Sequence, residues 1–319
     1  MDGEPDLLPD LLLVKSGGPS VFHEWRDGFA VARPGLTVQE WDDAVDPARV
    51  TYVLVGQPVH GRLAGFPRLK AIFSGGAGVD HLVSDPGTPR GLPIIRMAAH
   101  ETAQTMGEYV CLSVLGLLRQ WRRMALAQER AQWDHFLGTR TALTTRVGLM
   151  GLGHVGQMAA RMLGGLGFPV SGWSLNRKSL PGVECFGGSE LDEFLGQADI
   201  VVGLLPHTPH TDGLICARTI AAMRPGAALV NAGRGSLVVL PDLVQALDTG
   251  RLSAAVLDVF PTEPLPPEDP AWRHPRITVT SHIAGFATRA VRARYVVENM
   301  AVLEAGGTPE FLYRPERGY

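Results

Sequence analysis

Residues 146–156, RVGLMGLGHVG, constrain the fold of this chain more than any other stretch. The first half is an apolar run that predicts a buried strand, and the apolar residues of VGQMAARMLGGL, which follows, recur at helical spacing. Gly151 permits a tight turn, Gly153 lets a pyrophosphate approach the backbone, and Gly156 allows the helix to pack closely on the strand. Because a helix N-terminus attracts phosphates, this context favours a dinucleotide-binding turn over a tight turn without a ligand.

Apolar segments alternate with helical patterns through the middle of the chain. Their lack of polar alternation predicts a parallel sheet that is covered by helices on both faces. The predicted strands are residues 146–151, 169–174, 199–205, 227–232, 254–260 and 277–283. A second set of apolar segments predicts a smaller α/β domain near the N-terminus, from residues 10–14, 50–56, 69–75 and 92–98. Two domains suit a chain of 319 residues.

Two helical patterns connect these domains. Residues 107–133 predict one long helix that bridges the first domain and the second, and residues 288–304 predict a helix that returns the chain to the first domain. On the returning helix, Val291, Tyr295 and Val302 form an apolar stripe that we expect to lie in the core.

Arg234 follows the apolar residues 227–230 and stands between two glycines in NAGRG. A charge beside a buried strand is costly unless it has a partner. One interpretation is an ion pair within the chain, and the other is an anionic substrate that arrives from solution. We expect the second, with Arg234 free of an internal partner and with its neighbouring glycines letting the backbone and a cofactor approach closely.

Two further reactive side chains follow other predicted strands. Glu263 comes after residues 254–260, and His282 lies near the end of residues 277–283. Ligands of open parallel sheets bind outside the carboxyl ends of the strands, so we expect Arg234, Glu263 and His282 to converge. A guanidinium can hold a carboxylate and polarise a ketone, an imidazole can donate a proton, and a neighbouring carboxylate favours the protonated imidazole. The set suits reduction of a 2-keto acid, although each residue alone has an ordinary structural interpretation.

The motifs GLGHVG, LPHTPHT, NAGRG, LDVFPTEP and SHIAG, in this order and spacing, resemble those of the D-isomer-specific 2-hydroxyacid dehydrogenases over nearly the whole chain. In that family the Arg, Glu and His of the last three motifs are the catalytic set, which implies the same role for Arg234, Glu263 and His282. Within the family, MGEYV, LRQWRR, GWSLNRKS and the terminal GY are most similar to the glyoxylate/hydroxypyruvate reductase A type.

This resemblance implies a fold, a reaction and an assembly. The implied fold is a Rossmann-type doubly wound parallel sheet, residues 99–287, inserted in a smaller flavodoxin-like α/β substrate domain made from residues 1–98 and 288–319. The implied reaction reduces a small 2-keto acid to the D-2-hydroxy acid by hydride transfer from NADPH or NADH. The family is usually dimeric, so we expect a homodimer.

The stretch SGGAGVDHL, residues 74–82, resembles the glycine-rich loop that the family places over the substrate carboxylate. The resemblance implies that the backbone N–H groups of Ala77 and Gly78 bind this anion, together with Arg234 and His282.

One position departs from the reductase type, which often has a Trp after the strand that aligns with residues 50–56. Gly56-Gln57 stands in its place here, so we expect a wider or differently shaped substrate pocket.

The loop GWSLNRKS predicts the choice of cofactor. An NAD-selective site needs an acidic residue about 20 residues past the glycine turn, where it accepts a hydrogen bond from the ribose 2′-OH. No Asp or Glu lies between Gly172 and Gly182, and an Arg and a Lys there suit a 2′-phosphate. We therefore expect a preference for NADPH, with NADH as a possible second cofactor; the alternative is a solvated basic loop. The expected cofactor contacts are Met106, Gly151, Gly153, His154, Val155, Gly156, Ser174, Asn176, Arg177, Lys178, Leu205, Pro206, Thr208, Ala232, Gly233 and Asp258.

Composition excludes several classes of partner. The net charge is −3, which gives no electrostatic reason to expect nucleic acid or an anionic membrane as a partner. No apolar run approaches the roughly 18 residues of a membrane span. The three cysteines are far apart and fit neither a metal site nor a disulfide framework, so we expect no metal and a reducing cytoplasm.

Near relatives on the same fold supply the alternatives. One is a phosphoglycerate dehydrogenase-like NAD enzyme, although we expect such an enzyme to carry a further regulatory domain. A formate dehydrogenase would have Gln in place of Glu263. The other alternative is a non-enzymatic NAD-sensing corepressor-like protein, which can retain the same three side chains; a turnover assay distinguishes it from a reductase.

Overall fold

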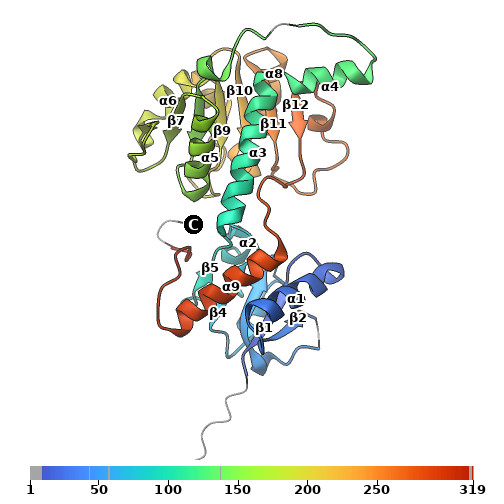
Figure 1. Cartoon of the computed structure of the whole chain (residues 1–319), viewed down its shortest axis with the longest axis vertical. Coiled ribbons are helices and arrows are strands. Elements are labelled where there is room, and N and C mark those ends of the chain that lie inside the picture. Colours follow the sequence, from blue (N-terminus) through green and yellow to red (C-terminus); the bar gives the residue numbers. More distant parts are fainter. Residues whose placement is uncertain (1–8, 43, 57, 137, 316–317, 319) are drawn as a thin grey trace, which may run out of the picture. The chain divides into compact units, whose positions relative to one another are not determined.

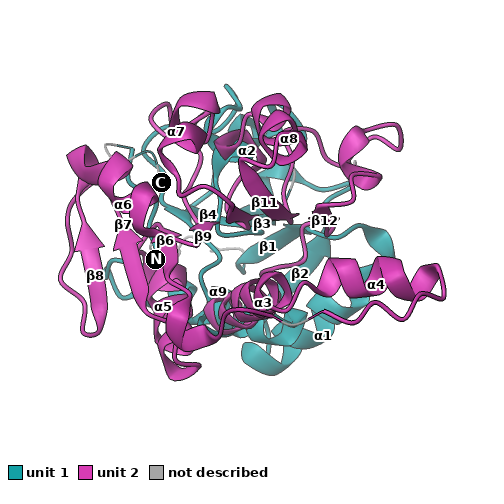
Figure 2. Ribbon diagram, turned by 90° about the horizontal axis from the view of Figure 1, so that it is seen from above, with its two compact units in different colours: residues 1–101, 287–319 teal, residues 102–286 magenta. Residues whose placement is uncertain are grey.

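The structure, a computed structural model, describes residues 9–42, 44–56, 58–136, 138–315 and 318 (Figure 1). The chain divides into two compact units, each built around its own parallel sheet (Figure 2). Unit 1 contains residues 1–101 and 287–319, and unit 2 contains residues 102–286. The predicted α/β fold with two parallel sheets is therefore confirmed.

Unit 2 contains a seven-stranded parallel sheet in the order β12-β11-β10-β9-β6-β7-β8. Its strands are β6 (Val147–Met150), β7 (Val170–Trp173), β8 (Val183–Phe186), β9 (Ile200–Gly203), β10 (Ala227–Asn231), β11 (Leu252–Leu257) and β12 (Ile277–Val279). The strand order reverses between β6 and β9, and ligands of such sheets bind at this switch point. The sequence did not predict β8, because only Cys185 and Phe186 of that edge strand are buried.

Helices cover both faces of this sheet, as the unbroken apolar strands require. Val110 of α3 (His100–Leu118) and Leu163 of α5 (His154–Gly165) belong to the core on one face. Phe194 and Leu243 belong to the core on the other face, which is formed by α6, α7 and α8. These three helices are Leu191–Gln197, Ala217–Ala222 and Leu240–Asp248.

Unit 1 contains a five-stranded parallel sheet in the order β2-β1-β3-β4-β5. Its elements are β1 (Leu11–Lys15), α1 (Phe22–Ala32), β2 (Thr37–Glu40), β3 (Val50–Val55), β4 (Ala71–Ser74), α2 (Asp80–Val83), β5 (Ile94–Ile95) and α9 (Arg289–Glu304). The half-buried strand β2 has no continuous apolar run and was not predicted. The two chain ends share one core, in which Trp25 and Phe29 of α1 pack with Val296 and Met300 of α9.

The helical predictions need two corrections. The expected helix over residues 107–133 is broken: α3 ends at Leu118, Gln120 has a left-handed backbone with φ of 53°, and α4 (Trp121–Glu129) then begins. Gln is a good helix former, so the sequence did not signal this break. On α9, the predicted stripe is rotated relative to the core, since Val302 is exposed while Ala293, between the predicted positions, is fully buried.

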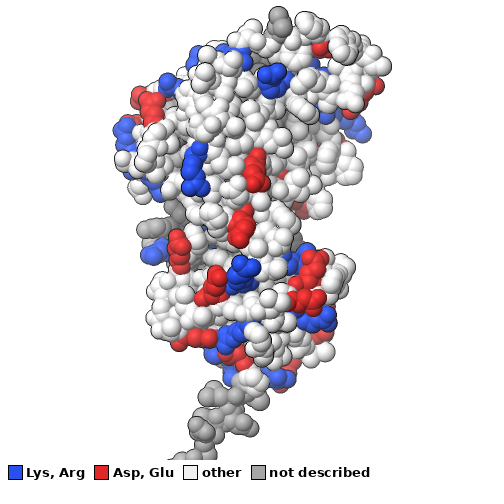
Figure 3. All heavy atoms as spheres, viewed as in Figure 1, with Lys and Arg blue, Asp and Glu red and all other residues white. Residues whose placement is uncertain are grey.

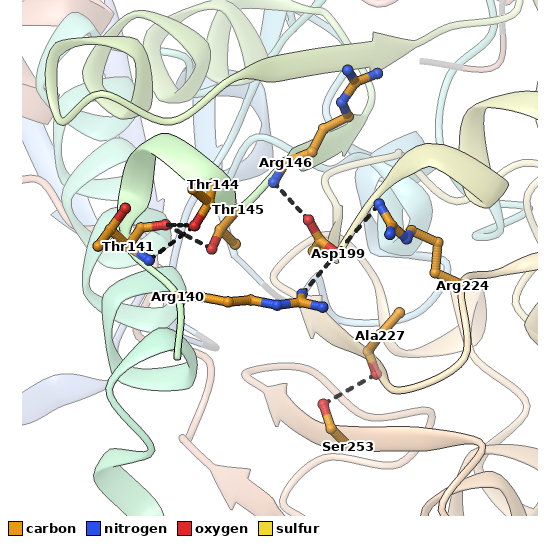
Figure 4. Close-up of polar contacts among 9 residues, drawn as sticks. All are labelled: Arg140, Thr141, Thr144, Thr145, Arg146, Asp199, Arg224, Ala227 and Ser253. Atoms are coloured by element: carbon orange, nitrogen blue, oxygen red, sulfur yellow. Dashed lines mark hydrogen bonds and ion pairs between the residues drawn. The ribbon is translucent and has the colours of Figure 1, made fainter. Parts of the chain in front are cut away.

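An ion-pair cluster joins the amino ends of three strands of unit 2 (Figure 4). The buried carboxylate of Asp199, just before β9, accepts hydrogen bonds from the main-chain N–H of Arg146 (2.9 Å) and from Nη1 of Arg140 (2.8 Å). Nη1 of Arg224, which precedes β10, lies 3.5 Å from the same carboxylate. Each of these charged groups is paired inside the protein, so the cluster fixes the edge of the sheet opposite the strand carboxyl ends.

The surface carries both signs of charge. On the face that Figure 3 shows, acidic and basic side chains of the described residues are interspersed rather than gathered into one patch. Within the described ranges, every helix is too short or too polar to cross a membrane.

Candidate active site

The glycine turn between β6 and α5 leaves room only where a ligand would approach. Gly151 has φ of 109°, a conformation that favours glycine. A Cβ on Gly156 would overlap the carbonyl oxygen of Gly151, whereas a Cβ on Gly153 would meet nothing within 4 Å. His154 and Val155 form the first turn of α5, whose N–H groups have no acceptor within the helix. The turn therefore fits an anionic group at Gly153.

The loops after β9 and β10 lie against each other beside this turn. A Cβ on Gly233 would be 2.7 Å from the carbonyl oxygen of Leu205. The hydroxyl of Thr211 donates to the carbonyl of Pro206 at 2.6 Å and accepts from the main-chain N–H of Thr208 at 2.9 Å. Of the expected contacts here, Leu205 and Ala232 are buried, and Pro206 and Thr208 are half-buried.

The loop after β7 presents the expected basic residues to solvent, together with one carboxylate. Asn176, Arg177 and Lys178 are exposed, and the hydroxyl of Ser174 donates to the carbonyl of Asn176 at 2.8 Å. Nη1 of Arg177 lies 2.8 Å from Oε1 of Glu190, just before α6. No local sequence pattern indicates this pairing, because 13 residues separate the two partners.

Arg234, which follows β10, has partners inside the protein. Its Nη1 donates to the carbonyl of Gly233 at 2.8 Å, and Nδ2 of Asn231 donates to the carbonyl of Arg234 at 2.9 Å. The expectation that Arg234 has no internal partner is therefore wrong. The close packing of the backbone, and not only the approach of a cofactor, explains why glycines flank Arg234. A Cβ on Gly235 would overlap the backbone of Phe260, and Gly233 approaches the backbone of Leu205.

Glu263 and His282 form a pair beyond the carboxyl ends of β11 and β12. Nδ1 of His282 lies 2.7 Å from Oε2 of Glu263, and Oε1 of Glu263 accepts a hydrogen bond from the main-chain N–H of Phe260 at 2.9 Å. A carboxylate can only accept at neutral pH, so Nδ1 carries the proton and Nε2 points elsewhere. Because β10, β11 and β12 are neighbours in the sheet, Arg234 follows the strand next to that of Glu263.

A buried carboxylate holds the segment that carries His282. Asp258 is 1% exposed, and its carboxylate accepts hydrogen bonds from the main-chain N–H groups of Ile283 and Ala284, both at 2.9 Å. Its main-chain carbonyl accepts from the N–H of His282 at 2.8 Å. These bonds stabilise the left-handed backbone of His282, with φ of 55°.

Two further residues of unit 2 support this segment, and sequence reasoning missed both. The hydroxyl of Thr280 donates to Asp258 at 2.6 Å, so Tyr109 of α3 donates to Thr280 across 2.7 Å. Burial raises the pKa of the Tyr109 hydroxyl, which keeps it a donor. Met106, an expected cofactor contact, is half-buried one turn earlier and packs near Gly285.

In unit 1, Ala77 and Gly78 lie in the loop between β4 and α2. Among the described residues, their main-chain N–H groups have no hydrogen-bond acceptor. A cavity of about 610 Å³ in the same unit has Ser16, Phe22, Trp41 and Gly56 among its lining residues. Gln57 lies outside the described residues.

Comparison with known proteins places these features in a family. Residues 111–284 match the NAD-binding domain of D-isomer-specific 2-hydroxyacid dehydrogenases. The glyoxylate/hydroxypyruvate reductase A of Serratia proteamaculans is 39% identical over 292 residues, which cover 90% of this chain and 93% of that protein. The reductase A of Yersinia enterocolitica is 35% identical and covers 93% of this chain and 96% of its own length.

Two solved structures are similar over almost their entire length. A D-isomer-specific 2-hydroxyacid dehydrogenase from Xanthobacter autotrophicus, in complex with NADPH and MES, has a TM-score of 0.91 and 38% identity, and covers 97% of this chain and 99% of its own. An NADPH-dependent glyoxylate/hydroxypyruvate reductase from Sinorhizobium meliloti, in complex with NADP and sulfate, has the same TM-score of 0.91 and 34% identity, and covers 97% of this chain and 100% of its own.

Proposed function

This chain belongs to the D-isomer-specific 2-hydroxyacid dehydrogenase family, and we propose that it reduces a small 2-keto acid to the D-2-hydroxy acid with NADPH. The observation that carries the proposal is the pairing of His282 with Glu263. Glu263 follows β11, which lies beside β10 in the sheet, and Arg234 follows β10. The similar reductases and the NADPH and NADP complexes support the choice of substrate class and cofactor.

The two units have different proposed roles, one in binding the dinucleotide and the other in binding the substrate. Unit 2 carries the glycine turn and the catalytic side chains, so we assign it as the dinucleotide-binding domain. Unit 1, made from both chain ends, carries the loop with Ala77 and Gly78 and is the substrate domain. The proposed substrate contacts are Ala77, Gly78, Arg234 and His282.

Arg234 binds the substrate carboxylate and polarises the ketone. A guanidinium is always charged and presents donors in a rigid fork, which suits a carboxylate and the neighbouring carbonyl oxygen. The bond from its Nη1 to the carbonyl of Gly233 occupies one donor and fixes the direction of the others. Bound NADPH would supply the hydride to the keto carbon.

His282 supplies the proton that the developing alkoxide needs. Its Nδ1 faces Glu263, so Nε2 is the atom that reaches the substrate. Glu263 stabilises the imidazolium before the proton is given up, and the Phe260 N–H fixes the orientation of this carboxylate. The carboxylate of Asp258 holds the N–H groups of Ile283 and Ala284, just after His282, so it acts on catalysis through position.

Residues of this chain fit NADPH. The first turn of α5 and the open space at Gly153 suit the pyrophosphate. Exposed Arg177 and Lys178 supply positive charge for the 2′-phosphate, although Glu190 competes for Arg177. The remaining proposed contacts are Met106, Gly151, His154, Val155, Gly156, Ser174, Asn176, Leu205, Pro206, Thr208, Ala232, Gly233 and Asp258.

The proposed substrate carries a larger substituent on its keto carbon than glyoxylate does, because the site has room for one. The cavity in unit 1 reaches Gly56, and Gly56 lies against the substrate loop, since a Cβ on Gly75 would be 2.7 Å from the Gly56 Cα. Aromatic side chains, Phe22 and Trp41, line this cavity and favour an apolar substituent.

We also infer a homodimer in a reducing cytoplasm. Trp121 and Trp133 of unit 2 are 69% and 96% exposed, and apolar side chains of this size are typical of interfaces. Cys111, Cys185 and Cys216 are all free thiols, which suits a reducing compartment.

Steady-state kinetics test the proposed function. Glyoxylate, hydroxypyruvate, pyruvate and phenylpyruvate are each assayed with NADPH and with NADH. We expect turnover with at least one 2-keto acid, and a higher kcat/KM with NADPH. Cofactor binding without turnover of any of them would contradict an active reductase.

A further inference from the structure

We propose that Arg96 and Arg292 are positioning residues for the loop of residues 75–78, so that the backbone N–H groups of Ala77 and Gly78 point toward a carboxylate. Arg96 orients the N–H of Gly78, and Arg292 anchors the start of the loop at Gly75. The inference rests on the proposed function, in which these two N–H groups bind the substrate carboxylate. Neither arginine belongs to the catalytic set. Arg292 lies 217 positions after Gly75 in the sequence.

Every carbonyl of residues 75–78 is held by a donor of unit 1. Nη2 of Arg292 donates to the carbonyl of Gly75, and Nε of Arg96 donates to that of Ala77 at 2.8 Å. The carbonyl of Gly76 accepts from the main-chain N–H of Met97 at 3.0 Å. The carbonyl of Gly78 accepts from the hydroxyl of Ser74 at 2.7 Å. The loop therefore has four consecutive peptide groups with fixed orientations.

The fixed carbonyls determine where the N–H groups point. In a trans peptide the C=O of one residue and the N–H of the next point in opposite directions. Arg96, by holding the carbonyl of Ala77, turns the N–H of Gly78 to the other side of the loop. Met97 does the same for the N–H of Ala77. Within residues 75–78, the N–H groups of Ala77 and Gly78 are the two that have no acceptor among the described residues.

Arg292 fixes the beginning of the loop and adds charge behind it. Its guanidinium lies 4.9 Å from the centre of the Trp25 ring, and Nε1 of Trp25 donates to the carbonyl of Ser16 at 2.8 Å. Burial lowers the pKa of Arg292 to about 10, so the group stays cationic at neutral pH. Arg292 is a partly buried cation that donates to the carbonyl of Gly75. Its positive charge favours an anion on the opposite side of the same loop.

Four variants and one control test the roles of the two arginines. The variants are Arg96→Met, Arg96→Lys, Arg292→Met and Arg292→Lys, and the control is Arg294→Met, an exposed cation on the same helix α9. For each, we would measure kcat and KM for the best 2-keto acid, the inhibition constant of oxamate, and the Kd of NADPH.

We expect both Met variants to raise KM and the oxamate constant by about tenfold or more, which corresponds to about 1.4 kcal/mol. The Kd of NADPH should stay within about twofold, because NADPH binds unit 2. The Lys variants, which keep the charge but lose the fork, should recover part of the affinity, and Arg294→Met should match the unsubstituted protein.

The unsubstituted protein separates this inference from the proposed function. Amide resonances of Ala77 and Gly78 should shift when oxamate is added to the NADPH complex. Absence of turnover, or of these shifts, would overturn the proposed substrate site itself. Turnover with normal KM and oxamate constants in the Met variants would overturn the positioning roles alone. If a Met variant fails to fold, the Lys variants decide: an unchanged oxamate constant in both would contradict the proposal.

Discussion

Nδ1 of His282 lies 2.7 Å from Oε2 of Glu263, and the other oxygen of that carboxylate is held by the main chain at Phe260. The pair therefore has a fixed direction, with Nε2 of the imidazole left for the substrate. This arrangement leads to a prediction about pH.

Glu263→Gln should move the alkaline limb of the kcat/KM profile for keto-acid reduction to lower pH. The imidazolium is the active form, so activity is lost as pH rises, and loss of the counter-charge makes the proton leave earlier. Initial rates between pH 5 and 10 at saturating NADPH measure the shift. His282→Ala, with low kcat and intact NADPH binding, is the companion variant. A profile unchanged by Glu263→Gln would mean that Glu263 does not act on the imidazole.

Arg234→Ala should lower kcat/KM by an amount equivalent to about 3 to 5 kcal/mol, because it removes both the carboxylate contact and the polarisation of the ketone. Arg234→Lys should recover only part, since a point charge cannot replace the fork. Steady-state kinetics with the best 2-keto acid decide. Nearly normal turnover of the Ala variant would leave Arg234 with a structural role alone, to which its bond to Gly233 contributes.

Gly235→Ala should destabilise the protein and misplace Arg234. A Cβ at this position would overlap the backbone of Phe260, and backbone atoms cannot move aside as a flexible side chain can. Overpacking of this kind costs about 1 to 3 kcal/mol, which urea unfolding would measure. Gly153→Ala, where a Cβ would meet nothing within 4 Å, is the matched control for stability. Equal unfolding midpoints for the two variants would contradict the argument.

The unsubstituted protein should use NADPH at least about tenfold more efficiently than NADH, a difference of about 1.4 kcal/mol. Arg177→Ala combined with Lys178→Ala should raise KM for NADPH and leave KM for NADH nearly unchanged. Glu190→Gln should act in the opposite direction, because it removes the carboxylate that lies 2.8 Å from Arg177. Equal or better efficiency with NADH in the unsubstituted protein would refute the preference.

Gly56→Trp should narrow the range of substrates. The backbone accepts a side chain there, since a Cβ would lie 3.5 Å from the Ser16 hydroxyl oxygen, an ordinary contact. The indole would occupy part of the 610 Å³ cavity, so kcat/KM for phenylpyruvate should fall by about tenfold while that for glyoxylate changes little. A parallel loss for both substrates would show that the cavity does not receive the substituent.

Sequence patterns were informative where local chemistry dominates. Continuous apolar runs predicted the central strands of both sheets, because those strands are buried on both faces. The edge strand β8 and the half-buried β2 lack such runs and were missed. The motifs drew attention to Glu263 and His282, which the structure brings within 2.7 Å of each other.

Contacts between distant segments were not accessible in this way. One acceptor of Arg234 is a main-chain carbonyl, which no side-chain pattern encodes. Glu190 reaches Arg177 only because η5 (Gly188–Glu190) follows β8 and lies beside the loop after β7 that carries Arg177. The contact of Arg292 with Gly75 joins residues 217 positions apart and depends on α9 closing the core of unit 1.

That return of the chain has a consequence for how the protein is made. The ribosome releases α9 after every strand of both sheets, so Trp25 and Phe29 lack the contacts of Val296 and Met300 until this helix has emerged. Unit 2 is a continuous segment whose strands all emerge earlier, and it can fold while unit 1 still lacks a wall of its core. A nascent chain stalled before residue 287 would therefore expose the apolar face of α1, the state in which we expect a chaperone to bind it.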